Sequence, residues 1–139
     1  MNELIKLDIP AKAEYVVLGR LALAGILRDR GYTADAVADL KLALTEACSN
    51  CIRHAYDDST GQVHLRFTVR EDRVELEVRD DGSGFHEEDD GPALDAVGKP
   101  ELSEGGMGIS IIRSVVDEFH LDRPSEGGTT LVLTKLRDA

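Results

Sequence analysis

The stretch Leu44-Thr-Glu-Ala-Cys-Ser-Asn-Cys-Ile-Arg-His-Ala-Tyr56 belongs to a longer run in which apolar side chains recur at helical spacing. These side chains predict one buried face of an amphipathic helix, and they are Val37, Leu40, Leu44, Ala47 and Cys51. Thr33 is the expected N-cap because its hydroxyl can accept a hydrogen bond from a first-turn amide, and Asp35 adds favourable negative charge. The pattern therefore predicts a helix from Thr33 to about His54 or Tyr56.

A polar ridge lies beside this apolar face. Glu46, Asn50 and His54 follow one another at intervals of one helical turn, so their side chains lie nearly in line. A carboxylate can take a proton from an attacking hydroxyl, and an amide oxygen is a hard ligand that suits Mg²⁺. Taken alone, the same spacing is also typical of an ordinary solvated helix face.

The segments around this helix alternate between strand and helix patterns. Alternating apolar residues predict a β-hairpin at residues 63–69 and 74–78, and further strands at residues 4–9, 120–123 and 129–136. Helical spacing predicts two more helices, at residues 12–30 and 109–119. This order indicates an α+β two-layer sandwich with helices on one face of a mixed, mainly antiparallel sheet. We expect residues 1–139 to form a single domain.

The two outer helices have expected core faces of their own. In the first helix the expected stripe is Val17, Leu21, Ala24, and Leu27 or Arg28, with Gly31 as the stop. Gly19 and Gly25 disfavour a helix by propensity, so we expect close packing against a neighbour at these positions. In the last helix the expected stripe is Ile109, Ile112, Val116 and Phe119.

Two glycine-containing segments add candidate ligand-binding groups. Asp80 is predicted at the end of a strand, where its carboxylate can accept a hydrogen bond from an exocyclic amine such as that of adenine. Gly82 and Gly84 would let the backbone approach a ligand closely. The segment Glu104-Gly-Gly-Met-Gly108 stands immediately before the last predicted helix, where free amides and the helix dipole favour a phosphate. In isolation, an Asp-Gly turn and a flexible hinge explain these segments as well.

Composition narrows the class of protein. The chain has 139 residues and a formal net charge of −11 with no Lys/Arg cluster, so direct binding of DNA or RNA is not expected. No secretory signal or membrane-spanning run is present, and we expect a cytoplasmic protein. Cys48 and Cys51 fall within the central helix, so we expect partly buried packing residues without a redox role.

Three segments in this order resemble the GHKL ATP-binding fold of histidine kinases, gyrase, Hsp90 and MutL-type ATPases. They are the helix that carries Glu46 and Asn50, the strand end with Asp80, Gly82 and Gly84, and the glycine segment at residues 104–108. More closely, the chain resembles the serine-protein kinase anti-sigma factors of the RsbW and SpoIIAB type. The resemblance covers nearly the whole chain. Residues 9–15 resemble the family's entry into its first helix, and residues 44–56 resemble its conserved helical motif, the N-box. Residues 99–102 resemble its lid, and residues 104–108 resemble its second glycine box.

The resemblance implies a role for each matching residue. Glu46 would be the general base acting on a serine hydroxyl, Asn50 would hold Mg²⁺ against the ATP phosphates, and Asp80 would bind the adenine amine. The other implied nucleotide-binding residues are Gly82, Gly84, Lys99, Gly105, Gly106, Met107, Gly108 and Thr129. Arg20 would belong to a partner-binding surface. Some relatives carry a basic residue where this chain has Ser103-Glu104, so Lys99 is a candidate replacement.

The implied cofactors are ATP or ADP and Mg²⁺. The implied partners are a sigma factor, an anti-anti-sigma protein of the STAS type, and a second copy of the chain in a homodimer. One alternative is a GHKL switch protein, or a kinase of a STAS partner, that binds no sigma factor. A second is a nucleotide-binding module without transfer activity. A histidine kinase is less favoured because no phosphoacceptor helix is present.

Overall fold

The structure, a computed structural model, describes residues 2–55, 61–80, 104–122 and 128–137. The elements within these residues are β1 (Glu3–Pro10), a 3₁₀ turn (Ala13–Tyr15), α1 (Val16–Leu27), α2 (Ala34–Ala55), β2 (Gln62–Val69), β3 (Arg73–Asp80), α4 (Glu104–Val115), β4 (Glu118–Asp122) and β5 (Thr129–Leu136). The strands lie in the order β1-β2-β3-β5-β4, and each neighbouring pair is antiparallel.

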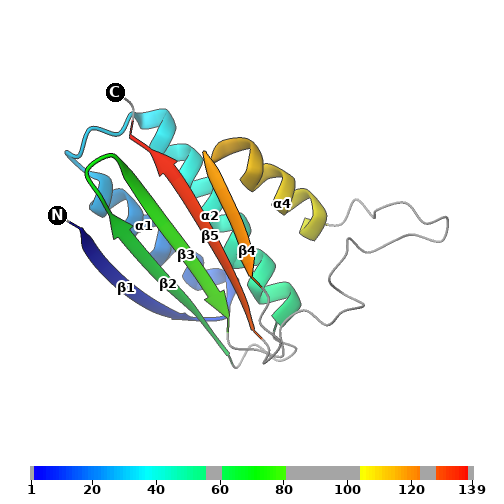
Figure 1. The fold of residues 1–139 in the computed structure, drawn as a ribbon. Coiled ribbons are helices and arrows are strands. Elements are labelled where there is room, and N and C mark those ends of the chain that lie inside the picture. Colours follow the sequence, from blue (N-terminus) through cyan, green and yellow to red (C-terminus); the bar gives the residue numbers. More distant parts are fainter. Residues whose placement is uncertain (1, 56–60, 81–103, 123–127, 138–139) are drawn as a thin grey trace.

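The molecule has two layers. Figure 1 shows the strands as one layer and α1, α2 and α4 together on its far side. The strands pack this way because their apolar residues alternate, so that Val63, Leu65 and Phe67 are fully buried under the helices. The predicted two-layer arrangement is confirmed, and the described strands form an antiparallel rather than a mixed sheet.

The central helix α2 forms as its sequence predicts. The Ala36 amide donates a hydrogen bond to Thr33 Oγ1 at 3.0 Å, which is the expected N-cap. Four positions of its apolar stripe are fully buried and Val37 is partly buried; the four are Leu40, Leu44, Ala47 and Cys51. Helix α2 therefore presents one apolar face to the sheet and carries the polar ridge beside it.

Helix α1 differs from its prediction in both length and orientation. It begins at Val16, after a 3₁₀ turn, and ends at Leu27. Its buried face is Val16, Gly19, Leu23 and Leu27. Val17 and Leu21, predicted for the core, are 40% and 63% exposed. The segment is apolar on several sides, so its spacing does not identify the buried face.

The glycines of α1 explain which face is buried. A Cβ on Gly19 would lie 2.9 Å from Leu65 Cδ1 and 3.0 Å from Leu44 Cδ2, so Gly19 lets α1 approach both the sheet and α2. Close packing is thus confirmed at Gly19. It is wrong for Gly25, because nothing lies within 4 Å of a Cβ added there.

The last helix is displaced toward the N-terminus relative to its prediction. Helix α4 spans Glu104–Val115, and Phe119 belongs to β4 rather than to the helix. Ile112 remains the buried anchor of the helix. Antiparallel pairing of Glu118 with Thr134 starts β4 two residues before the predicted strand. Pairing with a distant strand outweighs the helical spacing of Phe119.

Candidate functional site

Two buried polar residues meet where β3 ends and β5 begins. Asp80 is the last residue of β3, Thr129 is the first of β5, and the two are paired in register. Each is only 1% exposed. Thr129 Oγ1 is buried and makes no hydrogen bond within the part of the chain that the structure describes. Buried polar groups of native proteins nearly always have partners, so this hydroxyl indicates a place for a ligand or water.

Gly128 allows the two strands to come together at this point. Its backbone φ is +83°, which side-chain-bearing residues rarely adopt, and a Cβ here would lie 2.8 Å from the Asp80 carbonyl oxygen. The sequence motifs described above include Thr129 but not Gly128. The two consecutive glycines at 127 and 128 are the signal that could have identified it.

Helix α2 covers this end of the sheet. Figure 1 shows the C-terminal end of α2, the end of β3 and the start of β5 at the same end of the molecule. Asn50 is 4% exposed. The next residue, Cys51, is fully buried, and the negative charge of Asp80 helps to raise the pKa of its thiol, so the two side chains lie close together. The structure therefore brings the N-box helix and the predicted adenine-binding carboxylate together.

The two cysteines are buried more deeply than predicted, and both are free thiols. Burial raises the pKa of the Cys48 thiol to about 12. Burial is also the largest cause that raises the pKa of the Cys51 thiol, followed by the negative charge of Asp80 and by the neighbouring Cys48. Both groups are therefore neutral thiols at physiological pH.

Glu46 lies on α2 one turn before Asn50, and its side chain is only partly buried. Arg20 of α1 reaches the same region, because its Nη1 donates a hydrogen bond to Thr45 Oγ1 at 3.2 Å. The Thr45 hydroxyl in turn donates to the Lys41 carbonyl oxygen at 2.8 Å. The predicted partner-binding residue is thus tied to α2 at the position next to the predicted base.

The second glycine box lies inside a helix rather than before one. Helix α4 begins at Glu104, so Gly105, Gly106, Met107 and Gly108 occupy its first turns. Amides in the first turn of a helix have no acceptor within that helix, so those of Gly105 and Gly106 stay available to a phosphate, whereas Met107 and Gly108 lie deeper in the helix. Gly82, Gly84 and Lys99 lie outside the described residues.

The described side chains contain no cluster of three His, Cys, Asp or Glu residues that could hold a metal by themselves. Mg²⁺ bound with a nucleotide does not need such a cluster, because phosphate oxygens and waters supply most of its ligands. A buried amide oxygen such as that of Asn50 fits this need. The buried hydroxyl of Thr129 and the carboxylate of Asp80 similarly fit a purine.

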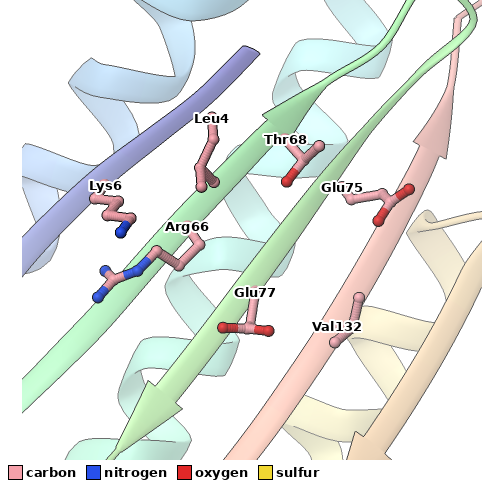
Figure 2. A pocket seen from close by; sticks show the side chains of 7 residues that line it. All are labelled: Leu4, Lys6, Arg66, Thr68, Glu75, Glu77 and Val132. Carbon is pink, nitrogen blue, oxygen red and sulfur yellow. The ribbon is translucent and has the colours of Figure 1, made fainter. Parts of the chain in front are cut away.

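A cavity of about 300 Å³ lies on the opposite face of the sheet. Figure 2 shows its side chains projecting from the strands on the side away from the helices. They come from four strands and are Leu4, Lys6, Arg66, Thr68, Glu75, Glu77 and Val132. None of the predicted site residues lines this cavity, so it is separate from the site between α2 and the strand ends.

Comparison with known proteins places this arrangement in a defined class. The family model of the histidine kinase-like ATPase domain matches residues 9–135. Two solved structures share the fold. One contains the RsbU and RsbW domains of a Mycobacterium tuberculosis protein, with a TM-score of 0.67 and 21% identity over 97% of this chain. The other is the histidine kinase domain of a blue-light-activated kinase from Erythrobacter litoralis, with a TM-score of 0.57 and 20% identity over 93% of this chain.

This chain spans 33% of the Mycobacterium tuberculosis chain and 62% of the Erythrobacter litoralis chain. The curated relatives match over most of both lengths. Serine-protein kinase RsbW of Bacillus subtilis is 40% identical over 136 residues, which cover 94% of this chain and 84% of the relative. Serine-protein kinase RsbW of Bacillus pumilus is 41% identical over 145 residues, which cover 97% and 88%.

The chain therefore belongs to the RsbW family of serine-protein kinases, within the histidine kinase-like ATPases. It is an ATP-dependent serine kinase, which confirms the resemblance to the anti-sigma kinases and the GHKL fold. In the described residues, every helix is too short or too polar to cross a membrane.

Proposed function

We propose that this protein is an anti-sigma factor that phosphorylates a serine of a STAS-type antagonist and, when the antagonist is phosphorylated, sequesters a sigma factor. The observation that carries the proposal is the buried pair of Asp80 and Thr129 beneath the N-box helix, in a chain of the RsbW family. Such a role belongs in the cytoplasm, where sigma factors meet RNA polymerase.

The nucleotide would bind between α2 and the ends of β3 and β5. Asp80 accepts a hydrogen bond from the exocyclic amine of adenine, and the Thr129 hydroxyl supplies a second polar group to the same ring. Asn50 holds Mg²⁺ through its amide oxygen. First-turn amides of α4, at Gly105 and Gly106, contact the phosphates. Gly82, Gly84, Lys99, Met107 and Gly108 complete the proposed nucleotide-binding set.

Glu46 acts as the general base on the serine hydroxyl of the protein substrate. Its side chain is partly exposed, so a loop of another protein can reach it. When bound, Mg²⁺-ATP supplies the phosphoryl group and neutralises the charge that develops during transfer. Glu46 takes the serine proton, while Asn50 and the amides of α4 keep the phosphates in place.

The partner surface would be centred on α1. Val17, Leu18 and Leu21 expose apolar side chains there, and Arg20 lies among them with its guanidinium turned toward α2. A phosphoserine on the STAS partner adds about two negative charges at this interface. Since the kinase has a net charge of −11, repulsion favours release of the phosphorylated partner and leaves α1 open to the sigma factor.

The catalytic assignment is tested by Glu46→Gln. We expect unchanged ATP binding by calorimetry and a loss of phosphotransfer of about 100-fold or more, because general-base catalysis contributes on that order. Glu77→Gln, on the outer face of the sheet, is the matched control and should transfer at the wild-type rate. Wild-type transfer by Glu46→Gln would remove Glu46 from the chemistry.

The regulatory assignment is tested by mixing the protein with candidate sigma factors and STAS proteins in ADP or ATP. A sigma complex that an unphosphorylated STAS protein dissociates is the expected result. Transfer to a STAS protein without any sigma complex would favour the alternative, a kinase that regulates its STAS partner alone. Analytical ultracentrifugation of the same samples tests the proposed homodimer.

A further inference from the structure

Lys135, near the end of β5, joins three elements through one side chain. Its Nζ donates a hydrogen bond to the Val115 carbonyl oxygen, in the last turn of α4, at 2.9 Å. The same nitrogen lies 3.4 Å from Asp39 Oδ2 of α2, with which it forms an ion pair. The Lys135 side chain is only 16% exposed, so these contacts are largely shielded from water.

The elements joined at Lys135 carry proposed nucleotide-binding groups. Strand β5 begins with Thr129, α2 carries Asn50, and the first turn of α4 contains Gly105 and Gly106. Six residues of strand separate Lys135 from Thr129, which is about 20 Å at about 3.3 Å per residue. Figure 1 shows the end of β5 at the opposite end of the sheet from its start. Any effect of Lys135 on nucleotide binding must therefore act through the placement of these elements.

We propose that Lys135 is a positioning residue that holds α4 in the direction in which its first-turn amides meet the phosphates of a nucleotide beside Asn50. This inference rests on the proposed nucleotide site and deepens it. It assigns part of the affinity for the phosphates, and none of the affinity for adenine, to the contacts of Lys135 with Val115 and Asp39.

The length of α4 makes its first turn sensitive to these contacts. From Glu104 to Val115 the helix extends about 16 Å, so a tilt of about 10° at its last turn moves its first turn by about 3 Å. A hydrogen bond to a phosphate oxygen is lost after a shift of about 1 Å. The fully buried Ile112 lies only one turn before Val115. Both anchors belong to the second half of the helix, and the first turn follows the direction that they set.

A lysine suits this position because of its charge. The last carbonyl groups of a helix have no partner within it and carry partial negative charge, which an ammonium group stabilises. Backbone contacts also tie this end of α4 to β5. The Asp117 amide donates to the Thr134 carbonyl oxygen at 2.9 Å, and the Leu136 amide donates to Asp117 Oδ2 at 2.7 Å. Because these bonds do not depend on Lys135, we expect the fold to persist when Lys135 is replaced.

The test compares Lys135→Met, Lys135→Arg and the control Lys6→Met in the whole chain. Lys6 is an exposed lysine on the outer face of the sheet, so its replacement removes the same charge without touching α4. Calorimetry gives the affinity of each variant for ADP with Mg²⁺, and competition against ADP gives its affinity for adenosine. We expect Lys135→Met to reduce the preference for ADP over adenosine by about fivefold, a typical effect of residues that act on a site without touching its ligand. Lys135→Arg keeps the charge and the donor and should keep most of the preference, and Lys6→Met should match the wild type.

The preference separates positioning from a loss of stability. Partial unfolding of a variant lowers its apparent affinity for both ligands by the same factor and leaves their ratio unchanged. Equal losses of ADP and adenosine affinity in Lys135→Met would therefore overturn the inference. A loss of preference in Lys135→Arg as large as in Lys135→Met would overturn it as well.

The contact with α2 is tested by Asp39→Asn, alone and combined with Lys135→Met. Asp39→Asn should reduce the preference for ADP in the same direction and by less, because the ion pair is longer than the hydrogen bond to Val115. In the double variant it should add nothing, because the carboxylate acts through the ammonium group. Losses that multiply in the double variant would show that the two residues act independently and would overturn the proposed link to α2.

The outcomes distinguish this inference from the proposed function. If the wild type binds ADP no better than adenosine, the phosphate-binding part of the proposed site fails. If the wild type prefers ADP and Lys135→Met keeps the full preference, the role of Lys135 fails while the site stands.

Discussion

At the scale of single residues, the end of the sheet depends on Gly128. Its φ is positive, and a Cβ at this position would lie 2.8 Å from the Asp80 carbonyl oxygen, so any side chain would separate β5 from β3. The same residue therefore determines both a local backbone conformation and the distance between Asp80 and Thr129. We therefore expect Gly128 to affect both the stability of the fold and the proposed nucleotide site.

Gly128→Ala should lower the free energy of unfolding by about 2 kcal/mol, from left-handed backbone strain and from the clash with backbone. The matched control is Gly25→Ala in the interior of α1, where a Cβ meets nothing within 4 Å. That change should raise stability by about 0.5–1 kcal/mol. Urea denaturation measures both, and equal effects of the two changes would contradict the strain at Gly128.

The sequence identified only some of the residues that lie at the candidate site. Asp80, Thr129 and Asn50 are buried polar residues near one end of the sheet, where sequence motifs placed them. The sequence predicts only packing for Cys51, because Asp80, whose charge helps to raise the pKa of its thiol, is 29 positions away (51 to 80) and nothing local indicates that the two lie close together. A contact between residues so far apart in the chain has no periodicity that a sequence could reveal.

At the scale of elements, α2 is the helix on which the site depends. It packs against α1, α4 and the sheet, and it carries Glu46, Asn50 and Cys51 on successive parts of its surface. Its N-terminus is stabilised by the Thr33 hydroxyl. This end of α2 is far from the proposed site. A substitution there can therefore change the stability of the protein without changing its affinity for the nucleotide.

Thr33→Ala should therefore lower the free energy of unfolding by about 1 kcal/mol, because the Ala36 amide loses its cap. Thr33→Ser keeps the hydroxyl and should remain close to the wild type. Thermal or urea unfolding gives the stability, and ATP affinity should stay unchanged in both variants. A loss of stability in Thr33→Ser as large as in Thr33→Ala would argue against the capping role.

The elements also show where periodicity succeeds and where it does not. The strands β2 and β3 follow a strict alternation that only one orientation can satisfy, so their buried faces are predictable from sequence. Helix α1 is apolar on several sides, so its orientation depends on the small surface of Gly19 against Leu44 and Leu65. The end of α4 is not predictable in this way because β4 pairs with β5, a contact outside the segment.

At the scale of the whole molecule, polar side chains on the outer face of the sheet add to the backbone pairing between β1 and β2. The Asp8 Oδ1 accepts hydrogen bonds from His64 Nδ1 at 2.7 Å and from Arg66 Nη1 at 3.0 Å. The hydrogen bond from His64, followed by that from Arg66, lowers the pKa of Asp8 below its usual value. This carboxylate therefore favours the folded state when it is ionised.

Because the pKa of Asp8 is lower in the folded chain, its contribution to stability is complete above the unfolded value, about 3.9. It is lost as the pH falls through the lower folded value. Asp8→Asn should therefore reduce stability at pH 7 and show a smaller decline in urea midpoint on acidification below about pH 4 than the wild type. Asp122→Asn, on the outer face of β4, is the matched control. Parallel acid profiles for Asp8→Asn and the wild type would contradict this role.

The net charge of −11 is also a property of the whole molecule. It predicts nothing about the fold, but it favours partners with basic surfaces and the release of phosphorylated ones. The proposed partner surface on α1 and the nucleotide site on α2 are adjacent through the hydrogen bond of Arg20 to Thr45. Partner exchange and phosphotransfer are thus proposed for neighbouring helices of one small domain.

By itself, the sequence determined the order of strands and helices, the capped amphipathic helix with its polar ridge, and the family to which the chain belongs. These features depend on local spacing and on short motifs, which can be recognised within short stretches of the sequence. Only the tertiary structure decided the buried face of α1, the junction of Gly128 with Asp80 and the proximity of Cys51 to Asp80. The physical reason is that each of these depends on atoms far apart in the chain, whose contact exists only after the helices have packed on the sheet.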